Sequence, residues 1–186
     1  TYLNPCICYQ CYKLKSINLP DSLLVLSDNC FAYTAIEIDL VLPDSVYYIG
    51  DSCFSYSKIK SVKLNPVLLS LPSNCFRGCS SMETIDMGTV IQSIGQGSIR
   101  ECTSLKHIVF PATLTYIGDN ALYSDTSLQY IVLYSTTPPT MATTVSLEKT
   151  NNCPIYVPDD SINLYKYATN WASYATRIKG LSEFIQ

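Results

Sequence analysis

An interval of 23 residues recurs along the first 133 residues and constrains the fold more than any other feature. It spaces one column of mostly large apolar residues by steps of 23, 23, 22, 23 and 23: Cys8, Phe31, Phe54, Phe76, Ile99 and Leu122. A second column has the same spacing but for one step of 22: Leu19, Leu42, Leu64, Met87, Phe110 and Leu133. Repeats of this length predict a solenoid, in which each unit buries its apolar side against its neighbours.

Each repeat ends in a short segment of alternating apolar residues, which predicts a half-buried strand. These segments are Ile17–Leu19, Leu40–Leu42, Val62–Leu64, Ile85–Met87, Ile108–Phe110 and Ile131–Leu133. Stacked one per repeat, they should pair in parallel about 4.8 Å apart. The one missing residue lies between Phe54 and Leu64, and we expect it in a loop, where a deletion costs least.

Glycine occupies one slot in three repeats, as Gly50, Gly95 and Gly118. This column predicts a bend with unusual backbone angles. Ser27 and Pro72 fill the same slot in two other repeats, so the requirement is soft.

The slots resemble the BspA-like leucine-rich repeat family. The segments from Leu71-Pro72 to Cys79 and from Ile94-Gly95 through Cys102-x-x-Leu105-x-x-Ile108 carry the resemblance, which spans about residues 5 to 133. It implies an α/β-type leucine-rich repeat solenoid of about six repeats, with a parallel one-strand-per-repeat sheet. It also implies a surface protein of gut or oral anaerobic bacteria that attaches to proteins of a host or of a neighbouring cell.

The last 51 residues resemble the same family's C-terminal ending and predict a strand–helix cap. Ile155–Val157 reads as a last strand, and Asp159-Asp160-Ser161 offers an N-cap for a helix through Leu164, Tyr165 and Ala168. Trp171, Tyr174 and Ile178 suggest a second amphipathic turn. We therefore expect an array at residues 1–135, with its first repeat incomplete, and a capping segment at residues 136–186.

The nine cysteines fit the repeat register better than a disulfide framework or a metal site. Most members of the two cysteine slots are small: Cys30, Cys53 and Cys75 share one slot with Ile7, Ser98 and Ala121, and Cys11, Cys79 and Cys102 share another with Thr34, Ser57 and Asp125. Such slots predict small packing residues, although neighbouring repeats are close enough to leave disulfides open. Cys6, Cys8 and Cys11 lie near the start of the array, where reactivity is more plausible. Cysteine usage suits a reducing compartment, whereas the resemblance favours the cell surface or secretion, and we expect the latter.

Composition disfavours several function classes. The net charge is −3 and there is no cluster of Lys and Arg to hold a phosphate backbone, so nucleic acid is not an expected partner. No apolar run approaches the roughly 18 residues of a membrane span. His107 is the one histidine, and its expected neighbours Thr84 and Tyr130 include no acid to orient it. The carboxylate pair Asp159-Asp160 is explained by helix capping. We expect no catalytic residue, no metal and no cofactor.

Three sets of outward residues are candidates for binding a partner, either a protein or a glycan. The first lies on the strand sheet: Lys63, Asp86, His107 and Tyr130. The second lies between the paired apolar slots and predicts an apolar and aromatic patch: Leu24, Val25, Tyr47, Tyr48, Leu69 and Tyr116. The third is a shared slot of two tyrosines, Tyr33 and Tyr56.

These observations favour a non-catalytic protein-binding or adhesion module of a bacterial surface or secreted protein. The alternative is a scaffold segment that spaces other domains in a larger envelope or phage assembly. An enzyme is the least favoured class, because no acid, base or nucleophile clusters in the sequence.

Overall fold

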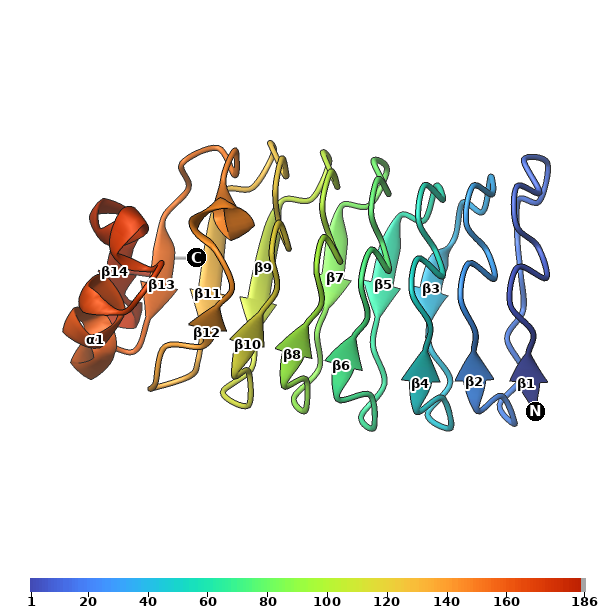
Figure 1. The fold of residues 1–186 in the computed structure, drawn as a ribbon, viewed down its shortest axis with the longest axis horizontal. Coiled ribbons are helices and arrows are strands. Elements are labelled where there is room, and N and C mark those ends of the chain that lie inside the picture. The colour runs from blue at the N-terminus through green and yellow to red at the C-terminus, as the bar shows by residue number, and fades with distance from the viewer. Residues whose placement is uncertain (185–186) are drawn as a thin grey trace.

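The computed structural model describes residues 1–184 and shows an elongated coil, with one turn of the coil for each repeat (Figure 1). The N-terminus lies at one end, and the helix α1 (Ile162–Tyr167) lies at the other. Two rows of parallel strands run along the coil. No helix in residues 1–184 is long and apolar enough to cross a membrane.

The first row is the predicted sheet, with one strand per turn. It consists of β3 (Asp39–Val41), β5 (Ser61–Lys63), β7 (Thr84–Asp86), β9 (His107–Phe110), β11 (Tyr130–Leu133), β13 (Ile155–Val157) and β14 (Ile178–Gly180). All of its pairings are parallel; β5 lies between β3 and β7, and the other four follow in the order β9-β11-β13-β14. Alternate residues of these strands point inward, so Leu40, Val62, Ile85, Ile108 and Ile131 are buried.

A second row of two-residue strands lies between the paired apolar slots of each repeat, where no strand was expected. It consists of β1 (Tyr2–Leu3), β2 (Val25–Leu26), β4 (Tyr48–Ile49), β6 (Ser70–Leu71), β8 (Ser93–Ile94), β10 (Tyr116–Ile117) and β12 (Thr140–Met141). The second residue of β2, β4, β6, β8, β10 and β12 is buried. Because the side chains of a strand alternate, the residue before it faces solvent.

The expected strand at Ile17–Leu19 does not form. Ile17 and Leu19 are half-buried, and the backbone contact of this stretch with the next repeat includes the bond from Glu37 N to Lys15 O at 3.0 Å. The segment therefore lies beside β3 without the ladder of bonds that defines a strand.

The two apolar columns that define the repeat form the core. Phe31, Phe54 and Phe76 stack in sequence, with 5.5 Å between ring centroids at each step and interplanar angles of 17° and 9°. Leu42, Leu64, Met87, Phe110 and Leu133 are buried beside them. The missing residue falls between Phe54 and β5, in a stretch without strands, as expected.

Backbone bonds between turns all run in one direction at the aromatic column. Phe31 N donates to Cys53 O at 2.8 Å, and Phe54 N donates to Cys75 O at 2.9 Å. The same bond recurs as far as Leu122 N, which donates to Ser146 O at 2.9 Å. At this column each turn therefore offers N–H donors to the turn that follows it.

The glycine column was predicted to need unusual backbone angles, and that prediction is wrong. Gly50, Gly95 and Gly118 do not have positive φ angles. Instead a Cβ on Gly95 would lie 2.7 Å from the backbone of Pro72 and Ser73, and one on Gly118 would lie 2.6 Å from Gln96 N. These glycines let successive turns approach closely. The left-handed conformation occurs elsewhere, at Asn29, Asn74 and Asn120 among others, with φ of 54°, 55° and 54°.

The C-terminal segment covers the last turn as expected, but the helix is not capped as predicted. Tyr165 and Trp171 are buried, and Trp171 Nε1 donates to Pro139 O at 2.7 Å. Ser161 makes no side-chain cap bond and donates instead to Thr136 O at 2.7 Å. Asp159 accepts from Ser182 N at 3.2 Å. Short 3₁₀ helices complete this part at Thr144–Leu147, Asp159–Ser161, Ala172–Arg177 and Leu181–Glu183.

The cysteines are free, and six of the nine are buried. The Cys79 thiol donates to Phe54 O and the Cys102 thiol donates to Phe76 O, both at 3.2 Å. Burial raises the pKa of the Cys79 thiol to about 11. These contacts support the packing interpretation of the two cysteine slots.

Candidate functional site

The outer face of the first row of strands holds a groove of about 740 Å³. It crosses β3, β5, β7 and β9 and takes in three of the four residues expected on the sheet: Lys63, Asp86 and His107. Val41 is 61% exposed and Tyr134 is 50% exposed, and both line the groove together with Val109. The floor is thus apolar, with a few charged groups placed on it.

Charges in and around the groove are of both signs. Lys63 and Asp86 are direct neighbours on β5 and β7, and Asp86 Oδ1 accepts from Gly88 N at 2.9 Å. Along one flank, Lys60 pairs with Glu37 at 3.0 Å and Lys106 pairs with Glu83 at 2.9 Å. The hydrogen bond from Lys106 lowers the pKa of Glu83. Because positive and negative charges alternate, the groove has no continuous positive surface that would attract a polyanion.

His107 meets Tyr130, as the strand register predicted. The two rings stack with 5.0 Å between centroids, and Phe184 packs against Tyr130 at 4.9 Å. No carboxylate orients His107 within salt-bridge distance in residues 1–184. The arrangement makes an aromatic end wall beside the groove rather than an acid–base pair.

The second set of candidates lies on the row of short strands. Tyr47, Tyr48 and Leu69 are 55%, 51% and 51% exposed, and with Val67 they line a hollow of about 350 Å³. Leu24 and Val25 are half-buried beside them, and Tyr116 is exposed three turns further along. Electrostatic interaction with Tyr2 raises the pKa of Tyr47.

The third set lies on the turns that follow the aromatic column. Tyr33 and Tyr56 stack with 4.8 Å between centroids, and both adopt a left-handed conformation. The Arg77 guanidinium lies 5.7 Å from the Tyr56 ring. Glu101 accepts from the Tyr56 hydroxyl at 3.4 Å and pairs with Arg100 at 2.9 Å. Burial raises the pKa of Tyr56.

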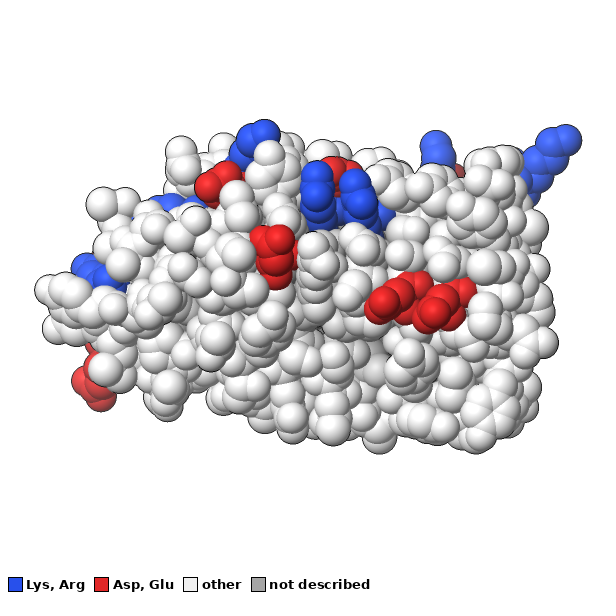
Figure 2. Space-filling view, in the orientation of Figure 1, with Lys and Arg blue, Asp and Glu red and all other residues white. Residues whose placement is uncertain are grey.

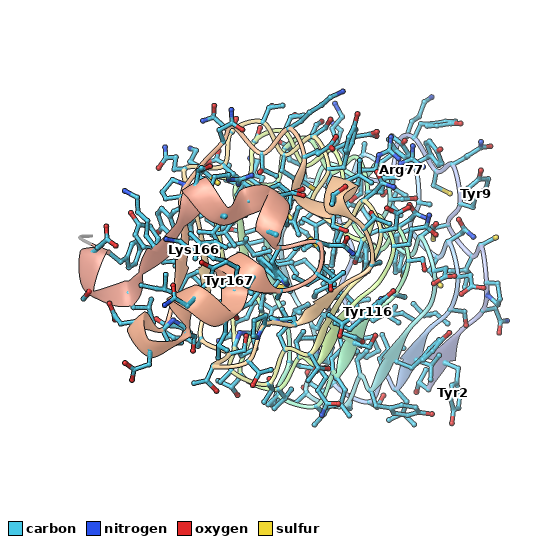
Figure 3. All side chains as sticks on the ribbon, turned by 60° about the vertical axis from the view of Figure 1, so that its left-hand side comes forward. Tyr2, Tyr9, Arg77, Tyr116, Lys166 and Tyr167 are labelled. Atoms are coloured by element: carbon cyan, nitrogen blue, oxygen red, sulfur yellow. The ribbon has the colours of Figure 1, made fainter. Side chains whose placement is uncertain are left out.

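The structure therefore groups the candidate residues on three separate surfaces. Figure 3 shows Tyr2 and Tyr116 on the side of the short strands, whereas Tyr9 and Arg77 lie along the opposite edge. The sequence interpretation did not include Tyr134 or Arg77. Tyr134 directly follows the last apolar residue of β11, and that position was an available signal.

Metal chemistry finds no support in the described residues. No group of three or more His, Cys, Asp or Glu side chains in residues 1–184 is placed to hold a metal ion. What the three surfaces share is exposed apolar area next to hydrogen-bonding groups, which suits recognition of a partner.

A family model for the "BspA type Leucine rich repeat region (6 copies)" matches residues 1–38 and 26–140. No curated protein matches the chain in sequence.

Two solved structures share the fold. A leucine-rich repeat protein from Bacteroides ovatus aligns with a TM-score of 0.62 and 20% identity, over 92% of this chain and 49% of that one. A leucine rich cell surface protein from Faecalibacterium prausnitzii aligns with a TM-score of 0.51 and 17% identity, over 97% of this chain and 61% of that one. The chain thus spans about half the length of the first and less than two thirds of the second.

Proposed function

The chain belongs to the BspA-type leucine-rich repeat family, and we propose that it is a non-catalytic module that binds a protein partner in the groove across β3, β5, β7 and β9. The bacterium would display it on its surface or secrete it, and its role would be adhesion. Residues 1–135 form the binding array in this proposal, and residues 136–186 cap it.

The groove is the observation that carries the proposal. Its volume of about 740 Å³ lies within the range of ordinary binding sites. Val41 and Tyr134 are exposed in it, and Val109 is half-buried between them. Exposed apolar surface in a hollow favours burial by a partner. Lys63 and Asp86 offer one charge of each sign, which can fix the orientation of a partner without demanding a highly charged one.

The surface location is supported by the description of the Faecalibacterium prausnitzii structure as a cell surface protein, although that likeness establishes the fold alone. The scaffold role remains the second candidate. It is supported by the length of the two solved structures, of which the chain covers 49% and 61%, because a stacked array within a longer protein holds the segments on either side of it apart.

An array of purified host and bacterial extracellular proteins, probed with the labelled chain, tests the proposal. A hit should weaken when Lys63→Glu and Val109→Asp are introduced together. Lys58→Glu is the matched control, because Lys58 is an exposed lysine outside the groove. Thermal unfolding of each variant checks that it is folded.

Absence of any hit on a broad panel would favour the scaffold role. A hit that survives the groove variant, or that weakens equally with Lys58→Glu, would place binding elsewhere on the chain.

A further inference from the structure

The outward positions of the short strands carry no charged residue along six successive turns. They form an uncharged strip of Leu24, Val25, Tyr47, Tyr48, Leu69, Ser70, Gln92, Ser93, Thr115, Tyr116 and Thr140. Figure 2 shows the same pattern, since the lower part of that face is white along the array. The opposite row of strands differs, because Asp39, Lys63 and Asp86 stand at its outward positions.

The uncharged strip combines flat rings with small hydrogen-bonding groups. Tyr47, Tyr48 and Tyr116 are about half exposed. Ser93 Oγ donates to Ser70 Oγ at 2.8 Å between two of the turns, and both residues are paired across β6 and β8. A tyrosine has an apolar body and a polar tip, and each serine hydroxyl can both donate and accept.

Charges that flank the strip are acidic and engaged within the array. Asp28 Oδ1 accepts from Asp51 N at 2.9 Å, and Asp51 Oδ1 accepts from Ser73 N at 3.0 Å. An anionic polymer would meet these carboxylates and be repelled. A cationic polymer would find both carboxylates already accepting hydrogen bonds from the backbone, and the strip itself holds no charge. The chemistry complementary to it is uncharged.

We propose that this strip binds a neutral polysaccharide that runs across the short strands, from the hollow at Tyr47, Tyr48 and Leu69 towards Tyr116. The C–H faces of sugar rings would pack on the exposed tyrosine rings, and sugar hydroxyls would exchange hydrogen bonds with Ser70, Gln92, Ser93 and Thr115. A linear polymer suits a shallow hollow of about 350 Å³ that continues as a strip from turn to turn, rather than a deep pocket.

A protein partner is the weaker match, because the middle of the strip is polar, at Ser70, Gln92, Ser93 and Thr115, whereas the cores of protein interfaces are more apolar than the rest of the surface. A second copy of the chain is the other occupant that an exposed aromatic surface suggests, and the test includes it.

Native affinity electrophoresis measures the binding directly. The chain is run through gels that contain hydroxyethyl cellulose, laminarin or galactomannan, and through gels that contain polygalacturonate or chitosan as charged counterparts. We expect retardation in at least one neutral gel. Raising NaCl to about 0.5 M, where the Debye length falls below about 5 Å, should leave the retardation in place.

The double variant Tyr47→Ala, Tyr48→Ala should lose the retardation, and Tyr116→Ala should reduce it. Tyr167→Ala is the matched control, because this tyrosine is exposed but lies outside both the strip and the groove. Circular dichroism of each variant before the gel run confirms that it is folded.

Several results would overturn the proposal: no retardation in any neutral gel, retardation only in charged gels, or retardation that survives the double variant. A dimer in sedimentation that the double variant dissociates would assign the strip to a second copy instead. Retention of polysaccharide binding by the groove variant Lys63→Glu, Val109→Asp separates this proposal from the proposed function.

Discussion

Asp125 accepts a hydrogen bond from the backbone of Cys102 one turn earlier, with 2.8 Å between Cys102 N and Asp125 Oδ1. The side chain is fully buried, and its other oxygen, Oδ2, has no hydrogen-bond partner in the described part of the chain. Asp125 occupies the slot that Ser57, Cys79 and Cys102 fill in other turns. There the Cys79 and Cys102 thiols donate to a carbonyl of the preceding turn, which a carboxylate can do only when protonated.

Burial raises the pKa of Asp125 well above its usual range, and the nearby Glu101 adds to the effect. An acid whose pKa is raised in the folded state stabilises that state below its unfolded pKa of about 3.9, and the contribution is lost as pH rises through the folded pKa. Asp125→Asn keeps the Oδ1 acceptor and supplies a permanent donor. We compare the free energy of unfolding of the variant with that of the parent at each pH. The advantage of the variant should be about 1–3 kcal/mol larger at pH 8 than at pH 5. Urea unfolding at both pH values measures this.

Asp160→Asn is the control, since Asp160 is exposed. A difference between Asp125→Asn and the parent that is the same at both pH values would show that Asp125 is ionised in the folded chain.

The stacked phenylalanines should dominate the stability of the array. Phe54 and Phe76 are fully buried and stack on each other. Phe54→Ala should lower the free energy of unfolding by about 3–5 kcal/mol, because it removes a large apolar contact and leaves a cavity. Denaturant titration gives the value, with Tyr167→Ala at a ring that is 86% exposed as the control. A loss below about 1 kcal/mol would contradict the assigned register.

Some glycines are required by close approach of the neighbouring turn and others by a positive φ angle. Substitution by alanine should lower the stability by different amounts in the two cases. A Cβ on Gly95 would meet backbone atoms at 2.7 Å, whereas one on Gly88 would meet nothing closer than 3.9 Å. Gly88 has a φ of 63°, so Gly88→Ala should cost about 1–2 kcal/mol of left-handed strain. Gly95→Ala should cost more, because neighbouring turns must move apart. Equal losses for the two variants in a thermal unfolding series would argue against close approach as the cause.

The native chain should expose few of its thiols. Cys53, Cys75, Cys79 and Cys102 are fully buried, and burial raises the pKa of each of these thiols. Cys6 and Cys11 are exposed. Labelling with a maleimide, followed by mass spectrometry of peptides, should modify Cys6 and Cys11 first and leave the four buried thiols until the chain is denatured. Rapid modification of Cys53 or Cys75 would mean that the turns open in the native state.

The sequence predicted the parts of the fold that repeat. The columns through Phe54 and Leu64 repeat in every turn, so their burial could be read from spacing alone. The short strands escaped prediction because two residues such as Tyr48–Ile49 are too few to show an alternation. The role of Gly95 was also misread, since its requirement comes from the backbone of the preceding turn and not from its own angles.

On the candidate surfaces, the sequence predicted the contacts that strand register sets but not those that depend on side-chain conformation. His107 and Tyr130 follow from strand register, and the structure stacks them. The pairing of Arg77 with Tyr56 depends on which side chains bend towards each other across turns, and no spacing rule fixes that. Gly78 leaves the space that the Tyr56 ring fills, because a Cβ there would lie 2.5 Å from that ring.

Along the aromatic column, the one-way backbone bonds make the two ends of the array chemically different. Leu122 N and Ser124 N find their acceptors at Ser146 O and Glu148 O, at 2.9 and 3.1 Å, so the segment that closes the array presents carbonyl oxygens at this column. At the short strands it also donates, from Thr140 N to Thr115 O at 2.9 Å. A whole turn can be added or removed anywhere without disturbing this polarity. A closing segment moved to the opposite end would therefore meet oxygen with oxygen along this column.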